Sequence, residues 1–359
     1  MEHRIVGFDP GTAPEDQVER YLDLEDRLIR ELENEDPSPL REHRRDTLGE
    51  THPQKQVYRW VAEAEFDGRQ VVTARGEITF VTENDTGCRD HGQHAMIDLG
   101  VDRRFRRQGL GTELLGVLVH RAVAGGRVRA IEACRFQESG WRFCAKHGGK
   151  LALEAAQNRL SLAEVDWGMM AEWRDGGAER NRARGTQLLS FQVVPEEMLE
   201  DLMGLYNEIV DAVPLGGLEM RVRVTPESRR MDEARTGRGW YTLVSREADG
   251  TLSGLTEVVH EWATPYRVEQ ELTGVRNEHR GRGLGKWLKA EMLFFIRDRL
   301  PEVMHVDTGN ADTNAPMISI NRRMGFKRHQ TERCYRFELE ALWTRLSALP
   351  ETSKLWQAA

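Results

Sequence analysis

The stretch RVEQELTGVRNEHRGRGLGKWLKAEMLFFIR, residues 267–297, joins a strand-like run, a basic glycine-rich turn and a helical pattern without interruption. The turn reads RGRGLG and spans residues 280–285. Apolar residues then recur at the four-residue spacing of a helix that buries one face: Leu284, Leu288 and Met292, extended by Phe295 and Ile296. The segment therefore predicts a strand, a tight turn and an amphipathic helix in that order.

This turn suits a phosphate group. A helix N-terminus leaves backbone N–H groups without partners and carries a partial positive charge. The glycines at positions 281, 283 and 285 would let a pyrophosphate approach those amides, and Arg280 and Arg282 would attract it. The spacing R-x-x-G-x-G matches neither the dinucleotide fingerprint nor the P-loop.

A second copy of the pattern lies upstream, in MIDLGVDRRFRRQGLGTELLGVLVHRA, residues 96–122. It also follows a strand-like run, residues 95–101, and its helix repeats Leu110, Leu114 and Leu118. Three landmarks recur with one offset of 174 positions: Arg106 and Arg280, Gly109 and Gly283, Gly111 and Gly285. A repeat of this length indicates a duplicated domain.

Both copies resemble motif A of the GNAT (GCN5-related) family of acyl-CoA-dependent N-acetyltransferases. The order of expected elements in each half fits an α/β (α+β) domain with a mixed, mostly antiparallel sheet flanked by helices. We expect a tandem arrangement with an N-terminal GNAT domain at residues 1–166 and a C-terminal one at residues 188–359. Residues 167–187, rich in charge and glycine, are expected to link them.

The resemblance implies that catalysis belongs to the C-terminal half. A glutamate on the motif A strand often acts as the base in this family, and the corresponding position holds Glu269, whereas the first copy has Ala95. Glu271 lies two residues further on, so on a strand it would share the face of Glu269 and is a second candidate. The N-terminal domain is expected to be non-catalytic or degenerate.

The resemblance also implies acetyl-CoA as the acyl donor, with no metal. In the second copy the expected cofactor-binding residues are Val275, Arg280, Gly281, Arg282, Gly283, Leu284, Gly285, Lys286, Asn310 and Asn314. In the first copy they are Val101, Arg106, Arg107, Gln108, Gly109, Gly111 and Thr112. Many family members protonate the departing thiolate with a tyrosine, but Asn321 stands at that position. Water, Tyr335 or Tyr241 are the remaining candidates for the acid.

Composition limits the other classes of function. The 359 residues carry a formal net charge of −8, which argues against a nucleic-acid-binding protein and suits amine substrates. The four cysteines show no CxxC or metal spacing, so reduced thiols are expected. Neither an apolar signal region nor a membrane span is apparent, which predicts a soluble cytoplasmic protein, monomeric or homodimeric.

The expected function is transfer of an acetyl group from acetyl-CoA to a primary amine of a small molecule. Direct attack in a ternary complex is expected because no serine or cysteine nucleophile stands beside a histidine. Two alternatives stay open. The same fold could use another donor, such as a longer acyl-CoA, a carrier-protein thioester or an aminoacyl-tRNA, or the protein could be a non-enzymatic acetyl-CoA-binding scaffold. The identity of the acceptor does not follow from the sequence.

Overall fold

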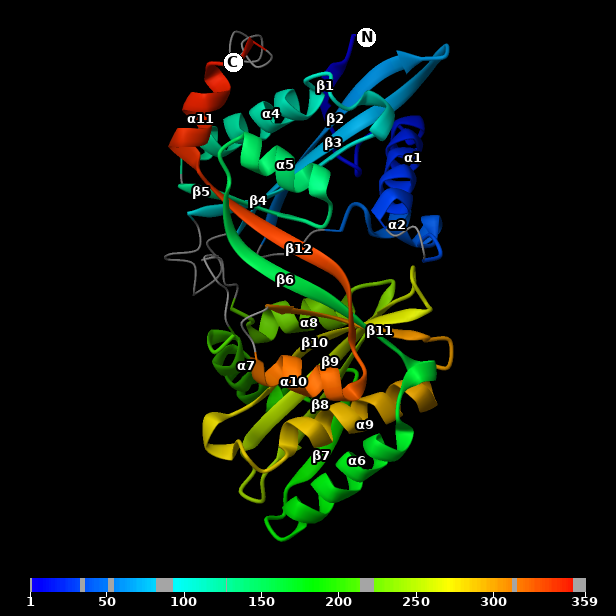
Figure 1. Ribbon diagram of the computed structural model, residues 1–359, viewed down its shortest axis with the longest axis vertical. Helices are drawn as coiled ribbons and strands as arrows, with labels where there is room; N and C mark the ends of the chain where they lie inside the picture. The colour runs from blue at the N-terminus through cyan, green and yellow to red at the C-terminus, as the bar shows by residue number, and fades with distance from the viewer. Residues whose placement is uncertain are drawn as a thin grey trace. The chain divides into compact units, whose positions relative to one another are not determined.

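The computed structural model describes residues 2–32, 36–50, 55–81, 93–126, 128–213, 223–311 and 315–350. The chain divides into two compact units (Figure 1). The described part of unit 1 consists of residues up to Glu154 together with those from Glu332 onward. Unit 2 consists of residues 155–213 and 223–331. Each unit therefore has its own set of six consecutive strands of the sheet and its own core.

Unit 1 has the sheet order β1-β2-β3-β4-β5-β12, in which only β4 and β5 pair in parallel. Its elements are β1 (Arg4–Gly7), α1 (Glu15–Leu32), α2 (Arg41–Thr47), β2 (Lys55–Phe66), β3 (Arg69–Val81), β4 (His94–Val101), η1 (Arg103–Phe105), α4 (Leu110–Gly125), β5 (Ala130–Arg135), α5 (Glu138–Lys146), the end of β12 and α11 (Leu339–Ser347). The expected helical stripe of Leu110, Leu114 and Leu118 is fully buried.

Unit 2 repeats this order as β6-β11-β10-β9-β8-β7, with β10 and β11 the parallel pair. Its elements are β6 (Lys150–Ser161), η2 (Leu162–Glu164), α6 (Trp167–Arg182), β7 (Gln187–Phe191), α7 (Glu196–Asp211), α8 (Pro226–Ala234), β8 (Arg238–Arg246), β9 (Leu252–Glu261), β10 (Arg267–Val275), η3 (Asn277–His279), α9 (Leu284–Arg299), β11 (His305–Ala311), α10 (Ala315–Met324) and β12 (Lys327–Glu338). The expected mixed, mostly antiparallel sheet is confirmed in both halves.

The units do not coincide with the expected domain boundaries. Strand β6 follows the helices of unit 1, but its residues 155–161 pair with β11 and complete the sheet of unit 2. Strand β12 follows the helices of unit 2, but residues 333–338 pair with β5 and complete the sheet of unit 1. A division at residues 166 and 188 would therefore remove a sheet strand from the first unit.

The expected linker also differs from the structure, because residues 167–182 form helix α6 of unit 2. Asp166 caps this helix by accepting a hydrogen bond from the Met169 amide. Its buried residues Met170 and Trp173 join the core of unit 2, and α6 lies beside α9 (Figure 1). A Cβ on Gly177 would come within 2.5 Å of the Trp287 side chain, so this glycine permits the close approach of the two helices.

The expectation of reduced cysteines is wrong for one pair. Cys134 on β5 and Cys334 on β12 are opposite one another in the antiparallel ladder and form a disulfide across 200 positions of sequence. Because the two cysteines are far apart in the sequence, rules based on cysteine spacing, which detect only local motifs, do not predict this pair. Cys144 is a free cysteine and is buried in α5.

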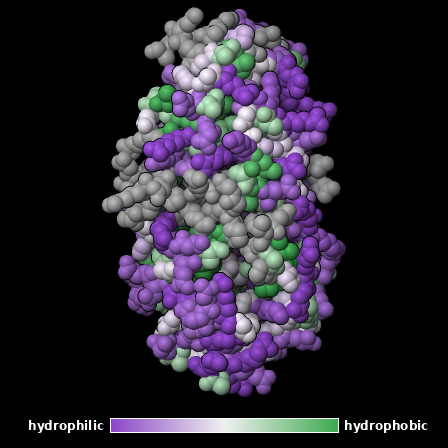
Figure 2. Space-filling view, turned by 60° about the vertical axis from the view of Figure 1, so that its left-hand side comes forward, coloured by the Kyte–Doolittle hydropathy of each residue, from purple (hydrophilic) through white to green (hydrophobic). Residues whose placement is uncertain are grey.

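Hydrophilic side chains cover most of the described surface on the face drawn in Figure 2. Large exposed apolar side chains occur singly along the chain, as at Leu40, Val193 and Met304. In the part of the chain that the structure describes, no helix is long and apolar enough to cross a membrane.

Candidate active site

Strands β10 and β11 separate in the middle of the sheet of unit 2. Among the described residues, their parallel pairing ends where Glu269 meets Asp307. Beyond that point β11 continues along β6, while β10 continues along β9 as far as Val275. In unit 1, β4 and β5 separate in the same way after Met96. An open strand edge of this kind offers backbone groups to an extended ligand.

The glycine-rich turn follows β10 directly. Gly281 and Gly283 have φ angles of +78° and +82°, which side chains disfavour, and Gly283 is the N-cap of α9. The Arg280 Nε atom donates to the Val275 carbonyl at 3.1 Å, which ties the turn to the strand. A Cβ on Gly281 would meet nothing within 4 Å, so the space in front of the turn is open. The turn and the first amides of α9 therefore form an open anion cradle.

The loop of unit 1 has the same backbone but a different electrostatic state. The Arg106 Nε atom donates to the Val101 carbonyl at 2.9 Å, and Gly109 caps α4 with a φ of +89°. However, the Arg106 guanidinium forms two hydrogen bonds to the Glu31 carboxylate, at 2.6 and 2.7 Å. The cation that would attract a phosphate is therefore already neutralised.

Other expected residues of the first loop carry further differences. Arg107 stands where the second loop has Gly281 and adopts a φ of +65°. Gly111 faces the Phe143 ring, which a Cβ would approach to 3.3 Å. The Thr112 hydroxyl is buried within 3.2 Å of His147 Nε2, whereas Gln108 is exposed. Unit 1 thus keeps the backbone shape of the cradle but surrounds it with different side chains.

The Arg282 guanidinium serves the structure of unit 2. It donates to Asn181 at 3.0 Å, to Thr186 at 2.8 Å and to Glu247 at 2.9 Å. Burial by itself would raise the pKa of Glu247, but hydrogen bonds that include those from Arg282 and Thr186 hold it below its usual value. The Arg282 side chain is therefore not available to a phosphate, and only the backbone amide of this residue could bind one.

Three cations surround the start of α9: the expected Lys286, and Arg180 and Arg323, which motif spacing did not indicate. The Arg180 guanidinium lies against Gly283, where a Cβ would come within 2.9 Å of it. Burial and the nearby charges of Arg323 and Arg180 lower the pKa of Lys286. Lys286 and Arg323 lie 5.2 and 5.1 Å from the Trp173 ring centroid. Arg180 and Trp173 belong to the segment read as a linker, so the spacing of motif A could not reveal them.

Glu269 lies at the point where the two strands separate. Its carboxyl group is half-buried, and burial followed by the charge of Asp307 raises its pKa to about 7. Asp307 itself forms a two-point ion pair with Arg159, at 2.7 Å for each bond. A carboxyl group with a pKa near neutrality can accept a proton from an ammonium group at physiological pH.

Glu271 is brought close enough to Glu269 for their charges to interact, but a β-bulge intervenes. The pairing with β9 shifts between Gln270 and Thr273, so the simple alternation that placed both glutamates on one face does not continue through this segment. Desolvation and then the buried Glu257 raise the pKa of Glu271. Because the Glu271 side chain is more exposed than that of Glu269, Glu269 is the stronger candidate for the base.

The expected asparagines and tyrosines leave the general acid unassigned. Asn310 lies on β11, but only its backbone is described, and Asn314 lies outside the described residues. Tyr335 is buried in the core of unit 1. Burial, followed by the charges of Glu257 and Glu271, raises the pKa of Tyr206 on α7, so this phenol holds its proton tightly and is not assigned as the acid.

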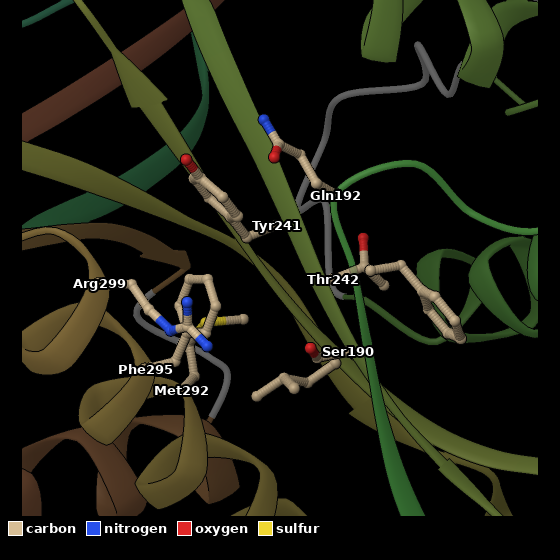
Figure 3. Close-up of a pocket in the computed structure, with 9 residues that line it drawn as sticks. Ser190, Gln192, Tyr241, Thr242, Met292, Phe295 and Arg299 are labelled. Atoms are coloured by element: carbon tan, nitrogen blue, oxygen red, sulfur yellow. The ribbon is translucent and has the colours of Figure 1, made fainter.

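Two pockets differ in size and position. A cleft of about 1040 Å³ in unit 1 is bordered by Val101, Arg106, Gly109 and Gly111. A smaller pocket of about 360 Å³ in unit 2 lies between β7, β8 and the C-terminal half of α9, with Tyr241, Phe295 and Arg299 around it (Figure 3). This pocket is at the opposite end of α9 from Gly283, so it is separate from the anion cradle. Tyr241 packs on Phe295 there, with ring centroids 5.1 Å apart.

Comparison with known proteins agrees with this geometry. Residues 22–148 match the model of the acetyltransferase (GNAT) family. The chain is 26% identical over 238 residues to a mycothiol acetyltransferase of Clavibacter sepedonicus. The alignment covers 64% of this chain and 68% of that protein. Residues 22–148 of the chain therefore match a GNAT acetyltransferase domain.

The fold of this chain is similar to the folds of solved GNAT proteins. One such protein, from the clavulanic acid biosynthesis pathway and solved without acetyl-CoA, aligns with a TM-score of 0.71 and 22% identity, over 94% of this chain and 99% of that one. A GCN5-related N-acetyltransferase of Sphaerobacter thermophilus aligns with a TM-score of 0.62 and 16% identity, over 94% and 96% of the two chains. Both units of the chain thus share the fold of these proteins.

Proposed function

We propose that unit 2 transfers an acetyl group from acetyl-CoA to a primary amine of a small molecule. The observation that carries this proposal is Glu269, a carboxyl group with a pKa of about 7 at the separation of β10 and β11. It lies on the same strand that leads into the anion cradle at Gly281 and Gly283. A base and a phosphate site are therefore connected by one extended strand edge.

Acetyl-CoA supplies the thioester whose acetyl group is transferred. The residues present fit its diphosphate, because the space above Gly281 is open and the first amides of α9 line it. Arg280, Arg180, Lys286 and Arg323 add positive charge around that cradle. The edge of β10 beyond Glu269 would hold the pantetheine arm by backbone hydrogen bonds.

Glu269 would remove the proton that the acceptor ammonium must lose before attack. The new bond joins the amine nitrogen to the acetyl carbon, the carbon–sulfur bond breaks, and a donor such as water returns a proton to the sulfur. Direct attack is favoured over an acyl-enzyme because Cys144, the free cysteine of the described chain, is in unit 1, where burial raises its pKa to about 11.

A CoA-release assay tests this function with polyamines, aminoglycosides and amino acids as acceptors. At least one amine should turn over, and Glu269→Gln should lower kcat by roughly 10²- to 10⁴-fold while Glu302→Gln, at an exposed carboxylate of the same unit, should not. Arg323→Gln, which removes a cation near Lys286, should raise KM for acetyl-CoA severalfold, whereas Arg322→Gln should change it little. Calorimetric binding of acetyl-CoA without turnover of any amine would instead support the scaffold alternative, and turnover of longer acyl-CoAs alone would support another donor.

Unit 1 is proposed to keep a weakened donor site. Its cleft borders the first loop, but the Arg106 guanidinium is already hydrogen-bonded to the Glu31 carboxylate. Replacing Glu31 by Gln should free that cation and strengthen binding of acetyl-CoA to unit 1 by roughly tenfold. Isothermal titration measures this as a second binding event. An unchanged isotherm would argue against a site in unit 1.

A further inference from the structure

The strongest unexplained cluster lies on β5 and β12 of unit 1. Cys134 and Cys334 face each other across the antiparallel ladder. Glu332 is two residues before Cys334, so on the strand it points to the same face. One ligand atom from each of these three residues lies within 4.8 Å of the other two, which is the spacing of a metal site.

The donor set indicates which cations would fit. Two thiolates and a carboxylate are ligands that Zn²⁺ accepts in proteins, and soft sulfur donors exclude Mg²⁺ and Ca²⁺ as good occupants. No hydrogen bond or ion pair joins Glu332 to another described side chain. The charge of Arg135 acts on it, but the Arg135 guanidinium is paired with Asp98 at 2.8 Å. Its carboxylate is therefore available as a ligand.

The site has one open side. Cys134 and its neighbour Arg135 border the large cleft of unit 1, whereas Cys334 is buried. Three protein ligands with access to a cleft leave a fourth tetrahedral position for water or a small ligand.

We propose that Cys134, Cys334 and Glu332 form a redox-controlled site for a thiophilic divalent cation. In the oxidised chain the two sulfurs are bonded to each other and hold no metal. Reduction by a low-molecular-weight thiol restores two thiols, and the reductant becomes a disulfide that carries away the two electrons. Zn²⁺ then displaces the two thiol protons and binds both sulfurs and Glu332.

This site would also control how the end of the chain is attached to unit 1. Residues 333–338 reach the sheet of unit 1 only after the whole of unit 2 has been traversed. Either the disulfide or the metal would tie this strand to β5, whereas the reduced, metal-free chain would rely on ladder hydrogen bonds and packing. The cluster therefore couples redox state and metal supply to the integrity of unit 1.

Cobalt titration of the full chain tests the proposal, because Co²⁺ bound to thiolate has a distinct charge-transfer absorption. The chain should carry Cys88→Ser and Cys144→Ala, which leave Cys134 and Cys334 as its two cysteines. After reduction and removal of the reductant, it should bind one Co²⁺, and Zn²⁺ should displace it. Oxidised protein should bind at least roughly tenfold more weakly.

Matched variants separate ligands from mere neighbours. Cys134→Ser should remove the absorption, and Glu332→Gln, which keeps both thiols, should weaken Co²⁺ binding at least roughly tenfold, whereas Glu338→Gln on the same strand should not. Absence of the absorption in the reduced chain would overturn the metal site. Equal Co²⁺ binding before and after reduction, with both thiols open to alkylation in untreated protein, would overturn the redox control.

Discussion

At the scale of single residues, Glu269 decides the pH dependence of the proposed reaction. Its carboxyl pKa of about 7 means that the base is half-protonated near neutrality. Because only the deprotonated form accepts a proton, kcat/KM should rise as the pH increases through about 7. Glu269→Gln should lose this acidic limb, and a limb from the acceptor amine at higher pH should remain. A profile unchanged near pH 7 in the variant would exclude Glu269 as the base.

Lys289 is a second residue whose burial has a measurable consequence. It lies within α9, is 1% exposed, and its ammonium approaches the Phe326 ring at 5.5 Å. Burial lowers its pKa to about 7. Sequence periodicity did not reveal this residue, because a lysine on a helix is normally solvated along its length.

Replacing Lys289 by Met should raise the free energy of unfolding of unit 2 at pH 7 by about 2–4 kcal/mol. The unfolded chain binds a proton between pH 7 and about 10.4 that the folded chain does not, so wild-type stability rises with pH across that range. The advantage of the variant should therefore shrink as the pH increases. Urea unfolding at pH 7 and 9 measures this, with Lys327→Met at an exposed position as the control. Equal stability of Lys289→Met and wild type at pH 7 would contradict it.

At the scale of elements, α6 shows how composition can mislead. Charged residues and paired glycines made residues 167–187 resemble a linker, yet Gly177 is buried against Trp287 of α9. The glycine removes a side chain at a helix contact, so its helix-weakening effect is offset by closer packing.

The two neighbouring glycines of α6 should respond in opposite directions. Gly177→Ala places a Cβ 2.5 Å from the Trp287 side chain and should destabilise unit 2 by roughly 1–3 kcal/mol. Gly176→Ala meets only the movable Arg180 guanidinium, at 3.2 Å, and should be neutral or stabilise by up to about 1 kcal/mol. Thermal melts of both variants provide the comparison. Similar melting temperatures for the two would show that α6 does not pack on α9 as described.

The two motif A segments were predictable because their signals are local. Helices α4 and α9 begin at Leu110 and Leu284, directly after glycines with positive φ. Both later helices, α5 and α10, are followed by left-handed glycines, Gly148 and Gly325. The two halves can therefore be recognised as similar from the sequence, because the turns at these helix ends require glycine at matching positions.

At the scale of the whole molecule, the exchange of β6 and β12 makes each unit depend on both ends of the chain. Unit 1 draws buried core residues from its C-terminal part, among them Tyr335, Phe337 and Leu342. A fragment of residues 1–166 should therefore fail to fold cooperatively. The same fragment joined by a flexible linker to residues 327–350 should recover a cooperative transition. Circular dichroism melts of the two fragments measure this, and a cooperative transition for residues 1–166 alone would refute the dependence.

The sequence by itself determined the duplicated architecture, the two glycine-rich turns and the strand position of Glu269, since each rests on residues that are neighbours along the chain. Only the tertiary structure decided that Glu31 neutralises Arg106, 75 positions away, and that Asn181 and Glu247 hold Arg282. It alone also brought together Cys134 and Cys334 and exchanged the two strands between the units. Local patterns encode turns and buried faces, but the partner of a charge or a thiol depends on which distant segments the packing of the core brings into contact.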